Sequence, residues 1–81
     1  MITCAIIDDE PLAVTLLESY VKRVPELDLK GKFLGAREAL DALKETPVDL
    51  VFLDIQMPEL TGLKLSRQLP ARTYVIFTTA Y

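Results

Sequence analysis

Two short apolar runs, each ended abruptly by aspartate, limit the folds open to this chain. Ile2–Ile7 is mostly apolar and stops at the acidic segment Asp8–Glu10, and Leu50–Leu53 is wholly apolar and stops at Asp54. The second run is too short for an ordinary helix, and continuous apolar runs of this length are typical of parallel strands buried on both faces of a sheet. We therefore predict two buried strands here, the second of them central in its sheet.

Segments with helical spacing alternate with strand-like segments along the rest of the chain. The expected helices cover about Pro11–Val24, Ala36–Leu43 and Leu63–Leu69, and the other expected strands cover about Leu27–Leu34 and Tyr74–Thr78. Alternation of this kind requires parallel strands joined by right-handed crossovers. We therefore predict an α/β fold with the element order βαβαβαβ.

Two local features refine this prediction. Asp9 or Glu10 can cap the first helix, and Pro11 suits its first turn because a missing N–H costs nothing there. The apolar alternation of the second strand breaks near Gly31, which suggests a strand at the edge of the sheet.

Composition restricts the chemistry. With 81 residues the chain has room for one domain. Cys4 is the only cysteine and there is no histidine, so a disulfide within the chain and a Cys/His zinc site are excluded and any metal must be held by oxygen. The net charge of −3, without clustered Lys or Arg, argues against nucleic-acid binding. No apolar run approaches the roughly 20 residues of a membrane helix, so we expect no membrane association and a cytoplasmic location.

Three aspartates follow the two buried strands. Ligands of parallel α/β sheets bind outside the carboxyl ends of the strands, so Asp8, Asp9 and Asp54 should converge there if the two strands are neighbours. Three carboxylates so close would repel one another unless a cation neutralised them, and Mg²⁺ prefers oxygen ligands of this kind. The alternative is that the first two aspartates cap a helix and the third starts a turn, which are common roles for aspartate.

Longer stretches around these aspartates resemble a known family. Ile-Ile-Asp-Asp-Glu-Pro at Ile6–Pro11, Leu-Asp-Ile-Gln-Met-Pro at Leu53–Pro58 followed by Gly62, and Phe-Thr-Thr-Ala-Tyr at Phe77–Tyr81 are similar to the signature blocks of response-regulator receiver domains. The resemblance spans the whole chain. It implies a CheY-like, flavodoxin-like parallel sheet with helices on both faces and the strand order 2-1-3-4.

The resemblance also implies a function. The position of Asp54 would accept a phosphoryl group from a sensor histidine kinase, and a receiver is not a turnover enzyme. Asp8, Asp9 and Asp54, with the main-chain carbonyl of Gln56, would hold Mg²⁺.

Further positions match the family's switch and its site-shaping loop. Thr79 matches the switch hydroxyl that hydrogen-bonds the phosphoryl group, with Thr78 as its rival; alternatively Thr79 is only a β-favouring residue at a strand end. Met57, Pro58 and Gly62 match the loop that shapes the site, although Met57-Pro58 is also compatible with a plain turn and a core methionine.

The family pattern continues beyond what this chain contains. The family's fold adds a further helix, a fifth strand ending in a lysine that pairs with the phosphoryl group, and a last helix. The lysines of this chain all fall on other elements: Lys22, Lys30, Lys32, Lys44 and Lys64. We therefore expect residues 1–81 to be a receiver truncated after its fourth strand, which puts its own phosphorylation in doubt. We also expect a homodimer or a swapped oligomer formed through the uncovered sheet.

The wording of the last two signature blocks resembles receivers of LytTR-type transcription regulators, in which DNA is bound by a separate domain absent here. Two other functions are alternatives. One is an interaction or dimerisation module without phosphotransfer. The other is an aspartate-nucleophile phosphatase, but that family requires a second aspartate two residues after the nucleophile, where this chain has Gln56.

Overall fold

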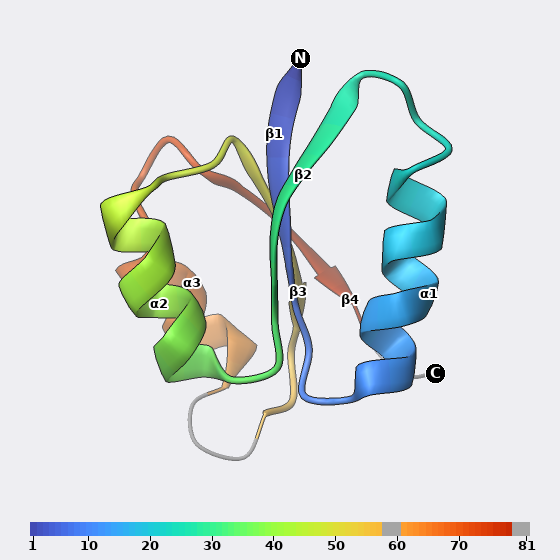
Figure 1. Ribbon diagram of the computed structural model, residues 1–81. Coiled ribbons are helices and arrows are strands. Elements are labelled where there is room, and N and C mark those ends of the chain that lie inside the picture. The colour runs from blue at the N-terminus through green and yellow to red at the C-terminus, as the bar shows by residue number, and fades with distance from the viewer. Residues whose placement is uncertain (58–60, 79–81) are drawn as a thin grey trace.

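The computed structural model describes residues 1–57 and 61–78. The elements follow the predicted order: β1 (Ile2–Ile7), α1 (Pro11–Val21), β2 (Leu27–Phe33), α2 (Ala36–Glu45), β3 (Leu50–Asp54), α3 (Gly62–Gln68) and β4 (Tyr74–Thr78) (Figure 1). The predicted element order is therefore confirmed. Among the described residues, no helix has the length and apolar character needed to cross a membrane.

The four strands form one parallel sheet in the order β2-β1-β3-β4, which confirms the predicted order. β1 pairs with both β2 and β3, so the first and third strands are direct neighbours. β2 lies at an edge as expected, and its register with β1 shifts between Cys4 and Ala5, opposite Leu29 and Gly31. The irregularity therefore lies where the sequence alternation breaks.

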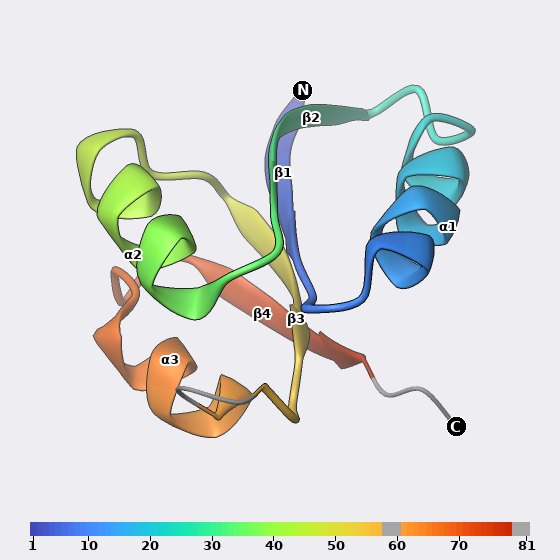
Figure 2. The ribbon, with the colours of Figure 1, turned by 60° about the horizontal axis from the view of Figure 1, so that its bottom comes forward.

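The larger core lies between the sheet and the pair α2 and α3, which cover one face (Figure 2). The alternate residues of β1 and β3 that point to this side, Ala5, Ile7, Val51 and Leu53, are all fully buried. They pack against the apolar stripe of α2, which consists of Ala36, Ala39, Leu40 and Leu43. Burial of an aliphatic side chain of this kind stabilises a fold by about 1.5–3 kcal/mol.

Of the helices in the described residues, only α1 covers the other face of the sheet (Figure 2). Val14 and Val21 of this helix pack on Cys4 and Ile6 of β1, and α1 packs chiefly against β1 and β2. Phe52 on β3 is consequently only half-buried, although Val51 and Leu53 on its opposite face are fully buried. The prediction that β3 is buried on both faces is therefore wrong for the face that α1 covers.

The start of α1 differs from the expectation. Glu10 occupies the N-cap position, but its side chain makes no capping hydrogen bond. Instead Oδ1 of Asp8 accepts a hydrogen bond from the backbone N–H of Glu10 at 2.9 Å. This is the Asx-turn geometry in which a short acidic side chain holds its own backbone two residues on. The carboxylate that organises the helix entrance is thus Asp8, two residues before the cap.

Candidate functional site

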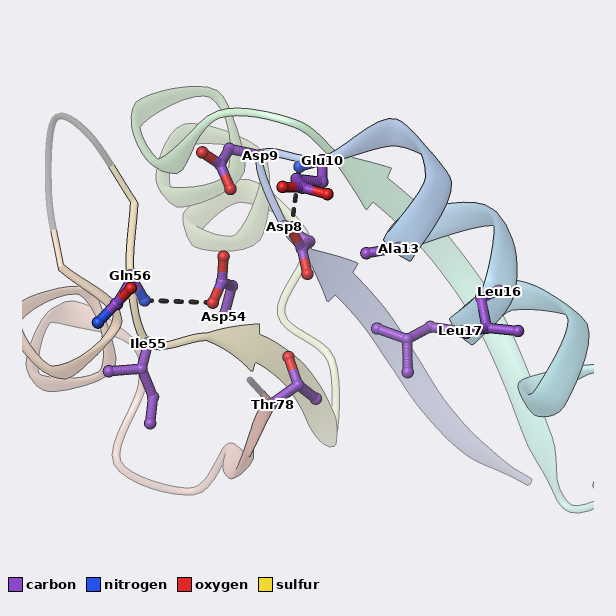
Figure 3. Close-up of a pocket in the computed structure, with 10 residues that line it drawn as sticks. All are labelled: Asp8, Asp9, Glu10, Ala13, Leu16, Leu17, Asp54, Ile55, Gln56 and Thr78. Carbon is purple, nitrogen blue, oxygen red and sulfur yellow. Dashed lines mark hydrogen bonds between the residues drawn. The ribbon is translucent and has the colours of Figure 1, made fainter. Parts of the chain in front are cut away.

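Three aspartates meet at the carboxyl edge of the sheet (Figure 3). Ile7 and Leu53 are register partners in the β1–β3 pairing, so the residues that follow them, Asp8 and Asp54, leave the sheet side by side. One carboxylate oxygen from each of Asp8, Asp9 and Asp54 lies within 4.8 Å of the others. Asp8 is buried, and Asp54 is half-buried. The predicted convergence is therefore present.

Two of the aspartates also hold their own backbone. Oδ1 of Asp8 accepts the N–H of Glu10, and Oδ1 of Asp54 accepts the N–H of Gln56 at 3.2 Å. The turn-forming role of aspartate, which was the alternative to a metal site, is therefore present for these two residues. It does not exclude the other role, because an ionised carboxylate has two oxygens and about four acceptor positions. The two hydrogen bonds orient both carboxylates within the cluster.

The electrostatics of the cluster disfavour three bare carboxylates. Burial raises the pKa of Asp54 above its ordinary value, and the neighbouring charge of Asp8 and the carboxyl of Asp9 raise the pKa further. The N–H of Gln56 opposes this shift because it hydrogen-bonds to the ionised form. A divalent cation would compensate the same repulsion. Mg²⁺ takes carboxylate and carbonyl oxygens and keeps several waters, so this all-oxygen donor set fits it.

The cluster forms one end of a cleft of about 660 Å³. The polar part of its lining comes from the aspartates, Gln56 and Thr78, and Ala13, Leu16 and Leu17 of α1 contribute an apolar wall (Figure 3). The sequence analysis predicts a helix here but does not place these residues at the cleft. Helical spacing shows that such residues share a face, but it does not show how far the helix covers the sheet.

Thr78, the rival switch residue, lies at this cleft. Thr78 is the register partner of Asp54 in the β3–β4 pairing. Its Oγ1 is buried and has no hydrogen-bond partner among residues 1–57 and 61–78. Thr79 and Pro58 lie outside the described residues.

Gly62 and Met57, two of the loop residues, lie next to the aspartate-bearing strand. The N–H of Gly62 donates to the carbonyl oxygen of Ile55 at 2.7 Å. A Cβ at Gly62 would overlap the carbonyl oxygen of Asp54 and would lie 2.8 Å from the Cα of Ile55. Glycine is therefore required by the close approach of two backbones. Met57 is buried in the larger core, so it anchors the loop on the side of α2 and α3.

Residues 4–81 match the protein family described as the response regulator receiver domain. The chain is 36% identical over 83 aligned residues to the transcriptional regulatory protein BtsR of Escherichia coli (strain K12), with 100% of this chain and 35% of BtsR covered. It is 40% identical over 83 aligned residues to an uncharacterized response regulatory protein of Vibrio vulnificus (strain CMCP6), with 100% of this chain and 34% of that protein covered. The chain thus spans about a third of the length of these curated relatives.

Solved structures agree with this match. The response regulatory domain of protein mrkE from Klebsiella pneumoniae superposes with a TM-score of 0.86 at 29% identity, covering 98% of this chain and 67% of that one. The response regulator domain of Thermotoga maritima CheB superposes with a TM-score of 0.89, covering 99% of this chain and 61% of that one. At 24% identity, the second likeness concerns the fold alone.

Proposed function

This chain belongs to the response regulator receiver family, and we propose on that basis that it accepts a phosphoryl group on Asp54 from a sensor histidine kinase. The observation that carries the proposal is the meeting of Asp8, Asp9 and Asp54 at the carboxyl edge of β1 and β3. The family is one of receiver domains in two-component systems, not of turnover enzymes. The match gives no support to the phosphatase alternative.

The proposed transfer is a displacement at phosphorus. An oxygen of the Asp54 carboxylate attacks the phosphorus, the bond from phosphorus to the histidine nitrogen of the kinase breaks, and the imidazole keeps the electron pair. Apart from the attacking carboxylate, the protein takes no covalent part in this reaction. It mainly positions the reacting groups and compensates the charge of the phosphoryl group. The N–H of Gln56 fixes the attacking carboxylate, and the turn held by Asp8 fixes its acidic neighbours.

Mg²⁺ is the proposed cofactor. Asp8, Asp9 and Asp54, with the main-chain carbonyl of Gln56, are the residues that would hold it. When bound, Mg²⁺ would offset the repulsion within the cluster and the negative charge of the phosphoryl oxygens. The raised pKa of Asp54 supports this assignment, because a nearby cation favours the ionised carboxylate that attack requires.

The remaining site residues keep the roles that the family resemblance implies. Thr79 is proposed as the switch hydroxyl, and Met57, Pro58 and Gly62 as the loop that shapes the site. The close packing of Gly62 against the backbone of Asp54 supports the role of the loop. The proposal assigns no phosphoryl-pairing lysine within residues 1–81. Phosphate on the wild-type chain would show that transfer does not require one.

The biological setting is proposed from the relatives. BtsR is named a transcriptional regulatory protein, so we propose that residues 1–81 are the receiver part of a protein that regulates transcription. DNA would then be contacted through another domain, of the LytTR type, and the protein would act in the cytoplasm.

The test uses acetyl phosphate as a small phosphoryl donor in the presence of Mg²⁺. Intact mass should show one added phosphate on the wild-type chain and none on Asp54→Asn. Mg²⁺ should also raise the thermal unfolding midpoint of the wild-type chain, because a ligand that binds only the folded state stabilises it. Phosphate on Asp54→Asn would place the acceptor elsewhere. Metal binding without phosphate on the wild-type chain would show that the cluster holds the cation but that the chain does not accept the phosphoryl group, and would overturn the proposal.

A second role, association between copies of the chain, is favoured by the sheet edge at β4. In the described part of the chain β4 pairs on one side only, with β3. Tyr74, Ile76 and Phe77 are 78%, 47% and 39% exposed, and the segment Tyr74–Thr78 contains no charged residue. Uncharged edge strands are templates for pairing with another chain. We propose that two copies associate through this strand.

A further inference from the structure

We propose that the hydroxyl of Thr78 donates a hydrogen bond to the phosphoryl group carried by Asp54. The inference rests on the proposed function of Asp54 and adds a second threonine to the one implied by the family resemblance. The two threonines are assigned on different grounds. Thr79 is assigned from the sequence motif alone, whereas Thr78 is assigned from its position beside Asp54 in the sheet.

Strand register places Thr78 beside the acceptor. Asp54 and Thr78 are partners across the parallel β3–β4 pair, and partners in register project to the same face of a sheet. Both residues line the cleft that also contains Asp8 and Asp9. In Figure 3 the hydroxyl of Thr78 points toward the side of the cleft where Asp54 and Asp8 lie. A group attached to Asp54 in this cleft would therefore come within reach of the hydroxyl.

The hydroxyl of Thr78 lacks a partner of its own. Its Oγ1 is the buried side-chain oxygen that has no hydrogen bond among residues 1–57 and 61–78. Burying a hydroxyl without a partner destabilises a fold, so native structures rarely do it without a functional reason. Strand propensity does not require the hydroxyl, because valine has the same branched shape and favours strands equally. A ligand oxygen in the cleft would satisfy the group.

The chemistry asks only for a neutral donor. During transfer from acetyl phosphate, an oxygen of Asp54 bonds to phosphorus, the bond from phosphorus to the acetyl oxygen breaks, and acetate leaves with the electron pair. Negative charge stays on the phosphoryl oxygens throughout. Thr78 would donate its O–H to one of these oxygens and transfer no proton. A donor already held in a low-dielectric cleft needs little reorganisation during the reaction.

The experiment measures the rate of phosphate addition by intact mass, with acetyl phosphate and saturating Mg²⁺. Thr78→Val should react roughly tenfold or more slowly than wild type, because a hydrogen bond to a charged group is lost. Thr78→Ser, which restores the hydroxyl, should recover most of the rate. Thr46→Val, at the exposed C-terminal end of α2, is the matched control and should react like wild type.

Two further measurements separate a hydrogen-bonding role from a structural one. Thr78→Val should melt at the same temperature as wild type or higher, because it removes an unsatisfied buried hydroxyl while keeping the shape. Its affinity for Mn²⁺, followed by electron paramagnetic resonance, should match that of wild type. Equal phosphorylation rates for Thr78→Val and wild type would overturn the proposed role of Thr78 and leave the proposed role of Asp54 unaffected. No phosphate on the wild-type chain would overturn the proposed function and, with it, this inference.

Discussion

Residues at the cleft show which parts of a site a sequence can reveal. Asp8, Asp9 and Asp54 were predictable because their positions at strand ends follow from the apolar runs before them, and parallel strands present their carboxyl ends at one edge. The position of Thr78 beside Asp54 was not predictable from propensity. It depends on the register of β4 against β3, and two adjacent threonines have the same preference for a strand.

Gly62 gives a prediction about a single Cβ. Gly62→Ala should destabilise the chain by about 2 kcal/mol or more, because the added carbon would meet the backbone of Asp54 and Ile55 rather than a side chain that can move. Helix propensity alone predicts the opposite sign, since alanine favours a helix over glycine by up to about 1 kcal/mol. Urea unfolding of the two proteins decides between these expectations.

Gly35→Ala is the matched control for this substitution. Gly35 is the N-cap of α2, one position earlier in its helix than Gly62 in α3, but a Cβ there would meet nothing within 4 Å, and its backbone is extended. Its replacement should cost less than about 1 kcal/mol, the usual difference between glycine and alanine at an N-cap. If the two variants were equally stable, close approach of the backbones would not be the reason for glycine at position 62.

The sequence predicted the presence of each helix and strand better than the residues at which it ends. The helical spacing of α1 runs on to Val24, but the helix ends at Val21. There the N–H groups of Arg23 and Val24 bond to the carbonyls of Tyr20 and Val21 in a tight turn. Pro25 forces the turn, because a residue before proline is disfavoured in the helical region. An apolar residue that continues the helical spacing therefore does not prove that the helix extends to it.

Asp49 links the amino ends of three strands through its side chain and its main chain. Oδ2 of Asp49, just before β3, accepts hydrogen bonds from the backbone N–H and the hydroxyl of Thr3 on β1, both at 3.0 Å. The carbonyl of Asp49 also accepts the N–H of Tyr74 at the start of β4. These contacts link three strands at the edge opposite the aspartate cluster.

The contacts of Asp49 predict a stability that depends on pH. The two hydrogen bonds from Thr3 lower the pKa of Asp49 in the folded chain below its ordinary value. A depressed carboxyl pKa contributes stability that is fully present above the unfolded pKa, near 3.9, and is lost as pH falls through the folded pKa. Wild type should therefore be more stable than Asp49→Asn at pH 7, and the gap should shrink only at strongly acidic pH.

Urea midpoints measured from neutral to strongly acidic pH test this expectation. Asp41→Asn, on the exposed side of α2, controls for the loss of one negative charge. A gap between wild type and Asp49→Asn that stayed constant down to the most acidic pH would show that hydrogen bonds to the ionised form contribute nothing.

The whole molecule has two unequal faces. Two helices bury one face of the sheet, while α1 leaves part of the other open over β3 and β4 (Figure 2). The strand order was predictable from the family resemblance and the alternation of elements. The open part was not predictable from the apolar run of β3, because that run is equally apolar on its two sides. Burial of Phe52 depends on elements elsewhere in the chain.

The two edge strands of the sheet differ in the features that would hinder pairing with a strand of another chain. β2 carries Asp28, Lys30 and Lys32, and it is distorted where its register with β1 shifts. Charges and irregularities of this kind discourage a second strand from adding to an edge. β4 has no charged residue. Association should therefore use the β4 edge, and two identical edges related by a twofold axis would pair antiparallel and join the two sheets.

Ile76→Lys tests this association. Ile76 is 47% exposed on β4, and a lysine there would place two like charges near each other across a twofold interface. Sedimentation velocity over a range of concentrations should show wild type moving from monomer to dimer, and the variant should need at least about tenfold more protein to associate, the equivalent of a change of roughly 1.4 kcal/mol. Leu34→Lys, an equally exposed apolar position just after β2, should associate like wild type.

A wild-type chain that stayed monomeric at millimolar concentration would show that the β4 edge does not mediate association. Equal weakening by both lysines would instead locate the contact outside β4.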